Sequence, residues 1–270
     1  MNRGARIDEA GRFASDGRLE EIVGRRVAVR TVSTDTALAG EVGRYHDEQL
    51  GPGLIDHGFI LERWENPASP RHPFLCAERR EPDSQRSVLL YGHADVQPPQ
   101  TAQWSPGLDP WTLTVDGDRW YGRGAADNKI QHTINLEALY LAIDSGQQLG
   151  FTVGVLIESG EEAGSPGLLE VCRAHADRLT ADVFIASDGP RIAADRPTIV
   201  LGSRGTSLIR LDVNLQDQAY YSATGVGCWP TQATDLRTRS PISVMRTAFS
   251  RCRNCARPGS RNPSGRPSTA

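Results

Sequence analysis

Short apolar runs alternate with helical stretches through the middle of this chain. The runs at 87–91, 151–157 and 183–186 are each long enough for one strand and are typical of strands buried on both faces. Between them, 128–145 carries an apolar stripe at helical spacing, and 166–179 also has helical character. This alternation predicts an α/β domain with a mostly parallel sheet.

The segments on either side extend this pattern. Residues 19–29 and 38–50 show apolar spacing that predicts two helices, and 59–64 and 74–78 predict two strands with prolines between them. Residues 98–118 predict a loop. Farther on, 207–215 predicts another strand.

Each of the three apolar runs is followed by side chains that bind metals. His93 and Asp95 come after the first run, Glu161 and Glu162 after the second, and Asp188 after the third. In open α/β sheets, ligands bind beyond the carboxyl ends of the strands. The sequence therefore predicts that these residues meet at one edge of the sheet.

The pair His93 and Asp95 has two interpretations. In a metal site His93 would bind the ion, and Asp95 would hold the other ring nitrogen and fix its tautomer. Otherwise, the pair is a histidine at a strand end beside a solvated aspartate. Taken alone, neither interpretation is preferred.

Asp127 stands at the start of the helix predicted over 128–145. A carboxylate there can bridge two cations, but taken alone it is more often a helix cap. Lys129 is the only lysine of the chain and could be a surface residue of the first turn.

Glu161 and Glu162 are adjacent carboxylates, which repel each other unless a cation or proton lies between them. One could bind metal while the other takes a proton from water acidified by the ion. The alternative is an acidic loop or helix start. Asp188 is either a carboxylate ligand or a turn residue.

Four motifs together resemble the metallopeptidase family 20 hydrolases, a group of dipeptidases, aminoacylases, acetylornithine deacetylases and succinyl-diaminopimelate desuccinylases. They are Gly92-His-Ala-Asp-Val, Gly122-Arg-Gly-Ala-Ala-Asp-Asn-Lys129, Glu158-Ser-Gly-Glu-Glu and Ser187-Asp-Gly. The resemblance covers residues 19–214. It is nearest to the dipeptidase branch, through Asp109-Pro-Trp and Asp116-Gly-Asp-Arg-Trp-Tyr-Gly-Arg-Gly.

The resemblance implies a zinc-exopeptidase-type three-layer α/β domain with a mostly parallel mixed sheet and two zinc ions, with cobalt or manganese as alternatives. It implies four metal ligands, with Asp127 bridging both ions: His93, Asp127, Glu162 and Asp188. It also implies Glu161 as general base and Asp95 as the residue that orients His93. The implied reaction is zinc-dependent hydrolysis of an amide bond in a small peptide or an N-acyl amino acid.

The sequence departs from this family in its last part. The lid histidine of the family is replaced by Tyr220-Tyr221-Ser222-Ala223, and no histidine follows His175, so the second zinc site is expected to be impaired. We expect 1–204 to be the N-terminal part of the catalytic domain, 205–221 the first strand of the lid and dimerisation domain, and 222–270 an aberrant, disordered tail. The sheet would be incomplete at the C-terminus, and most of the homodimer surface of the family would be missing.

Residues 222–270 carry eight arginines and one acid. Codons for 223–233, read one base earlier, can encode a motif like that of the family's lid, which predicts a frameshift after Tyr221. The alternative is a basic segment that binds nucleic acid, with Cys252 and Cys255 as half of a zinc knuckle. A knuckle needs four ligands, so we expect no nucleic-acid partner. The competing function for the whole chain is an inactive remnant that at most binds metal.

Charge and hydropathy exclude several other classes. The net charge of −3 favours neither nucleic acid nor a membrane surface for the chain as a whole. No apolar run approaches the length of about 18 residues that a transmembrane helix needs. The N-terminus lacks the apolar stretch of a secretory signal, so we expect a cytoplasmic protein.

Overall fold

The computed structural model describes residues 3–202, except 147, 190 and 194. The chain divides into two units at residue 200, and the first of them holds almost all of the described residues. The predicted strand at 207–215, the predicted lid strand at 205–221 and the basic tail at 222–270 lie outside this description. Among the described residues, no helix combines the length and the apolar character needed to cross a bilayer.

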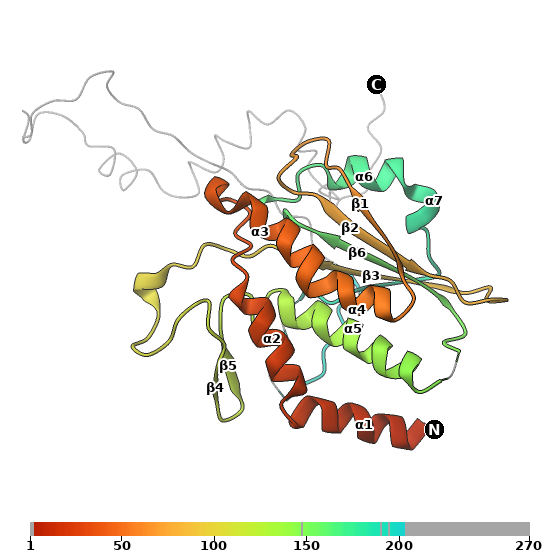
Figure 1. Ribbon diagram of the computed structural model, residues 1–270, viewed down its shortest axis with the longest axis horizontal. Helices are drawn as coiled ribbons and strands as arrows, with labels where there is room; N and C mark the ends of the chain where they lie inside the picture. Colours follow the sequence, from red (N-terminus) through yellow and green to blue (C-terminus); the bar gives the residue numbers. More distant parts are fainter. Residues whose placement is uncertain (1–2, 147, 190, 194, 203–270) are drawn as a thin grey trace, which may run out of the picture. The chain divides into compact units, whose positions relative to one another are not determined.

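Five strands form the central sheet, in the order β1-β2-β6-β3-β7 (Figure 1). Their bounds are Ile60–Trp64 (β1), Phe74–Arg79 (β2), Ser87–His93 (β3), Thr152–Glu158 (β6) and Val183–Ala186 (β7). Strand β2 is antiparallel to both β1 and β6, whereas β3 is parallel to both β6 and β7. Four strands thus run in one direction, which confirms the mostly parallel mixed sheet.

Helices cover one face of this sheet. They include α3 (Ala39–Arg44), the π-helical turn η2 (Tyr45–Leu50), α4 (Gly51–Asp56) and α5 (Lys129–Asp144), with the short η1 (Thr36–Leu38) before α3. Helix α2 (Arg18–Ala28) packs against α5 and η2. Side chains of η2, α4 and α5, among them Tyr45, Leu54 and Leu136, share a buried cluster with β2, β3 and β6. Helix α1 (Arg3–Ser15) packs with α2 and α5 in a second cluster.

The opposite face of the sheet is covered by α6 (Leu168–Ala174) and α7 (Ala176–Leu179), as Figure 1 shows. Val171 of α6 packs in a separate cluster with Trp64, Phe74, Leu89 and Leu156. The fold therefore has helices on both sides of the sheet, and the three-layer α/β prediction is confirmed. Since successive strand residues point to opposite faces, each face needs its own helices to exclude water.

Two local predictions differ from the structure. The helix predicted over 38–50 changes from the α-helical α3 to the π-helical η2 within that range and continues beyond it as α4, with Pro52 in the first turn of α4. The loop predicted over 98–118 includes the short helix η3 (Thr101–Gln103) and most of a hairpin, β4 (Thr114–Asp116) with β5 (Arg119–Tyr121). Gly117, with φ of +61°, provides the left-handed backbone that this tight turn requires.

The expectation that 183–186 is buried on both faces is wrong. Val183, Phe184 and Ile185 of β7 are 49%, 61% and 40% exposed. Within the described residues β7 pairs only with β3, and it is the last strand on that side of the sheet. An apolar run marks a strand, but its burial depends on which elements cover it.

Candidate metal centre

His93 is the last residue of β3, and its side chain is fully buried. Its Nδ1 lies 3.0 Å from the backbone carbonyl oxygen of Asp95 and 3.4 Å from Asp95 Oδ1. Both neighbours are acceptors, so Nδ1 carries a proton. In the neutral ring, Nε2 then presents its lone pair, as a metal ligand must.

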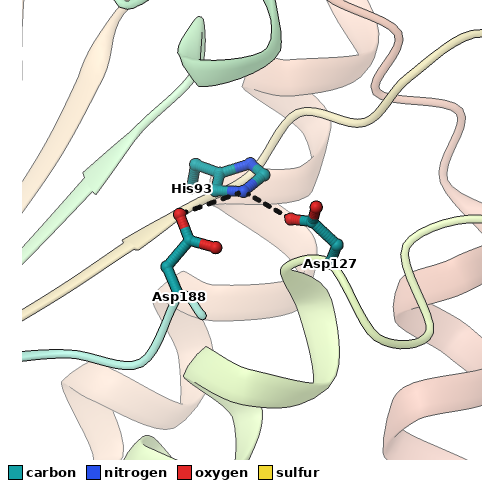
Figure 2. Close-up of side chains that lie close together, drawn as sticks. All are labelled: His93, Asp127 and Asp188. Atoms are coloured by element: carbon teal, nitrogen blue, oxygen red, sulfur yellow. Dashed lines mark hydrogen bonds and ion pairs between the residues drawn. The ribbon is translucent and has the colours of Figure 1, made fainter. Parts of the chain in front are cut away.

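Two carboxylates converge on this Nε2 atom (Figure 2). Asp127 Oδ1 lies 2.9 Å and Asp188 Oδ2 3.9 Å from His93 Nε2. One ligand atom from each of the three residues fits within a mutual distance of 4.8 Å. The three come from separate segments: the end of β3, the segment just before α5 and the segment after β7.

Glu161 and Glu162 open the short helix η4 (Glu161–Ala163) but lie differently. Glu161 Oε2 is 4.0 Å from His93 Nε2, at the border of the three-residue group. Glu162 Oε2 instead accepts a hydrogen bond from Gln97 Nε2 at 2.6 Å. The structure thus brings His93, Asp127 and Asp188 together with Glu161 beside them, and it directs Glu162 toward Gln97.

Asp95 is fully buried and holds the acidic turn in place. Its Oδ1 accepts the backbone N–H of Glu161 at 3.2 Å, and its Oδ2 accepts that of Glu162 at 3.1 Å. The expected contact with the His93 ring is made more closely by the backbone carbonyl of Asp95 than by its carboxylate. Asp95 therefore links the histidine segment to the glutamate segment.

The charges of the group perturb one another. Burial raises the pKa of Asp188 and of Glu161, and other acidic side chains of the site raise both further. Burial also raises the pKa of Glu162, with Asp127 adding to the effect. For His93, burial alone lowers the pKa, but the hydrogen bond and charge of Asp95, with those of the other carboxylates, raise it to about 9. The site holds more negative charge than its one imidazole balances.

This donor set fits a divalent metal. In a tetrahedral zinc site with bonds of about 2.0–2.2 Å, two ligand atoms lie about 3.3–3.6 Å apart. The 2.9 and 3.9 Å distances from His93 Nε2 bracket that value. Imidazole nitrogen and carboxylate oxygen are both zinc ligands in proteins, and a cation would relieve the mutual repulsion of the carboxylates.

The cap interpretation of Asp127 is not what the structure shows. The N-cap of α5 is Asn128, with no side-chain cap, and the Asp127 side chain is 64% exposed while it contacts His93. The peptide bond between Asp127 and Asn128 is cis. Asp127 thus belongs to the histidine cluster and not to the helix end.

Lys129 is fully buried, so the expectation of a surface position is wrong. Its Nζ donates to the carbonyl oxygens of Arg26 at 2.8 Å and Val29 at 2.6 Å, and it lies 5.0 Å from the ring centroid of Tyr45. It closes the C-terminal end of α2 behind the site. Nothing in the local sequence indicates this burial, because α2 is about one hundred residues away.

Comparison with known proteins identifies relatives of this chain. The protein-family model for peptidase family M20/M25/M40 matches residues 89–248 of this chain. Human beta-Ala-His dipeptidase is 34% identical over 192 residues, and Cys-Gly metallodipeptidase dug1 of Schizosaccharomyces pombe is 30% identical over 237 residues. Among solved structures, human carnosine dipeptidase 1 superposes with a TM-score of 0.63 at 25% identity.

The matches cover more of this chain than of its relatives. They include 69% of this chain but 36% of the human dipeptidase, and 83% of this chain but 48% of the yeast enzyme. The structural match covers 70% of this chain and 41% of human carnosine dipeptidase 1. The chain therefore spans less than half the length of the relatives that it matches.

Proposed function

This chain belongs to peptidase family M20/M25/M40, and from that premise we propose that it hydrolyses the peptide bond of a small peptide at the His93–Asp127–Asp188 centre. The observation that carries the proposal is the convergence of these three side chains, from three separate segments, on His93 Nε2. A structural ion pair would need one carboxylate, whereas a metal ligand set needs several donors.

Two ions fit the proposal unequally. The first would be held by His93, Asp127 and Asp188, and zinc suits this mixture of imidazole and carboxylate donors, with cobalt or manganese as alternatives. The second would share Asp127 and use Glu162 after the latter leaves Gln97. Among the described residues no second imidazole joins the group, so we expect the second ion to bind more weakly.

The chemistry divides between the ion and the protein. A bound divalent ion supplies Lewis acidity that polarises the substrate carbonyl and acidifies water. Glu161 stands beside the cluster without a hydrogen bond to His93, and its raised pKa suits a group that takes a proton from water and passes it to the leaving nitrogen. Asp95 holds the turn that carries Glu161 through its backbone N–H.

A dipeptide is the proposed substrate class, because the relatives named above are dipeptidases for beta-Ala-His and Cys-Gly. N-acyl amino acids are the second class, since they offer the same amide bond beside a carboxylate. An inactive remnant that only binds metal is the competing function. The dipeptidase, the deacylase of N-acyl amino acids and the inactive remnant differ in the metal content and the turnover that they predict.

The test measures zinc content and hydrolysis in the full chain, in Glu161→Gln and in Glu170→Gln, a control at an exposed glutamate of α6. Substrates are beta-Ala-His, Cys-Gly and an N-acetyl amino acid. Zinc binding with dipeptide turnover that only Glu161→Gln abolishes supports the proposal. Turnover of the acyl substrate alone selects the deacylase, zinc without turnover selects the remnant, and a chain that binds no zinc rejects all three.

A further inference from the structure

One buried carboxamide, that of Asn128, contacts both strand ends that carry the candidate metal centre. Asn128 is fully buried between α5 and the sheet. Its Oδ1 accepts the backbone N–H of His93 at 3.1 Å. Its Nδ2 donates to the backbone carbonyl oxygen of Ser187, the residue before Asp188, at 2.7 Å.

The orientation of this carboxamide is fixed by its partners. The Ser187 carbonyl can only accept and the His93 N–H can only donate, so Nδ2 and Oδ1 cannot be exchanged. Nδ2 also reaches Gln131 Oε1 at 2.6 Å. Every polar group of the Asn128 side chain therefore has a partner of the correct kind.

The orientation of Asn128 sets the hydrogen bonds behind it. His132 Nδ1 lies 3.1 Å from Asn128 Oδ1, which is an acceptor, so Nδ1 must carry the proton of the neutral ring. His132 Nε2 then accepts the hydroxyl of Tyr45 at 2.7 Å. Burial lowers the pKa of His132 well below its usual value and raises that of Tyr45, so both stay neutral. Donors from two sides therefore converge on Asn128 Oδ1: the chain from Tyr45 through His132 on one side, and the His93 N–H at the end of β3 on the other.

We propose that Asn128 is a positioning residue that holds His93 and Asp188 at metal-binding separation, so that the centre is formed before metal enters. It acts through the backbone of His93 and through that of Ser187, the residue before Asp188, and it needs no contact with substrate. The inference rests on the metal centre proposed above. Residues that orient metal ligands in this way typically change metal affinity by about 10–100-fold when replaced.

A purely space-filling role is the alternative. A Cβ on Gly92 would lie 2.9 Å from Asn128 Oδ1, so the carboxamide also occupies a tight place against β3. Asn128→Leu keeps the branching and the number of heavy atoms of the side chain, with two methyl groups in place of the polar groups, and removes every side-chain hydrogen bond. A space-filling residue tolerates this change, whereas a positioning residue does not.

The experiment titrates zinc into the full chain, Asn128→Leu and the control Asn135→Ala. Asn135 lies on the same helix and donates to the same serine, but to Oγ of Ser187 at 2.9 Å and not to its backbone. We expect Asn128→Leu to bind zinc at least about tenfold more weakly, and Asn135→Ala to stay within about threefold of the native chain. Cobalt loading should give an altered absorption band in Asn128→Leu alone. Native zinc affinity and an unchanged cobalt band in Asn128→Leu overturn the inference.

A second measurement needs no variant and covers the case in which Asn128→Leu fails to fold. In the metal-free native chain, the carboxamide protons of Asn128 should exchange slowly with deuterated water, because they are buried and bonded without the ion. Rapid exchange overturns the inference. Failure of the proposed function is distinguishable, because the native chain would then bind no zinc, or bind zinc without turnover, while the slow exchange persists.

Discussion

The carboxylate of Asp95 accepts the backbone N–H of Glu162 at 3.1 Å, across 67 residues of sequence. Its other oxygen accepts the N–H of Glu161. Because Asp95 is fully buried and lies two residues after His93, these bonds fix the glutamate turn relative to the imidazole. The placement of the proposed general base thus depends on a residue that need not touch substrate.

Asp95→Asn should lower zinc affinity and turnover together. The substitution turns one accepting oxygen into an NH₂ group that faces a backbone N–H, and a buried N–H left without an acceptor costs about 1–3 kcal/mol. We expect a fall of about 10–100-fold in zinc affinity, measured by calorimetry. Asp35→Asn is the control, because Asp35 also accepts a backbone N–H, that of Ala37, at an exposed turn. Equal zinc affinity in the two variants would contradict the prediction.

Lys129 should escape chemical labelling in the folded chain. It is the only lysine and is fully buried, with its ammonium bonded to two backbone carbonyls of the α2 end. An amine-reactive ester should therefore modify only the N-terminal amine under native conditions and both amines in urea. Peptide mass spectrometry reads the result, with the urea sample as the control. Rapid labelling of Lys129 in the native chain would show that its burial is wrong.

Glu158 should make the stability of the chain fall with rising pH. Burial raises its pKa from 4.5, against the lowering effect of hydrogen bonds from Tyr91 and Ser165, and its Oε2 has no partner in the structure. The unfolded chain releases this proton first, so the folded state loses stability as pH rises through the folded-state pKa. Glu158→Gln has no proton to lose. We therefore expect the free energy of unfolding of Glu158→Gln, measured in urea, to rise relative to that of the native chain between about pH 5 and about pH 8.

The control for this pH dependence is Glu170→Gln, at an exposed position of α6. Its stability curve should run parallel to that of the native chain. If the stability curve of Glu158→Gln were also parallel to that of the native chain, the Glu158 carboxyl would not change its charge within this pH range. That result would contradict the raised pKa.

Gly92→Ala should weaken the metal centre because the added methyl group would displace Asn128 and His132, which pack against the end of β3. The new Cβ would lie 2.9 Å from Asn128 Oδ1 and 2.9 Å from His132 Cβ, and overpacking of this kind costs about 1–3 kcal/mol. Gly154→Ala, on the neighbouring strand β6, is the control because its Cβ would meet the flexible end of Leu89 at 3.2 Å and the Val88 carbonyl oxygen at an ordinary contact distance of 3.9 Å. We expect urea unfolding and zinc titration to show a loss in Gly92→Ala that exceeds the loss in Gly154→Ala. An equally large loss in Gly154→Ala would mean that any added methyl group on these strands is destabilising, and it would contradict the prediction.

Local pattern was enough to predict the longer helices and strands and the family. The helix predicted over 128–145 is α5 at Lys129–Asp144, and the strand predicted over 74–78 is β2 at Phe74–Arg79. Such segments reveal themselves because hydrophobic period follows backbone geometry, which is a local property. The hairpin of β4 and β5 escaped prediction because its strands have three residues each, too few to show a period.

The sequence by itself determined the α/β class, the positions of the metal-binding residue types after the strands, and membership in the peptidase family. Only the tertiary structure decided which side chains meet. It placed Asp127 and Asp188 on His93, directed Glu162 to Gln97, and buried Lys129. It also left β7 exposed and made Asn128 the link between two strands. These outcomes depend on strand order and on packing between segments far apart in the chain, which no local period encodes.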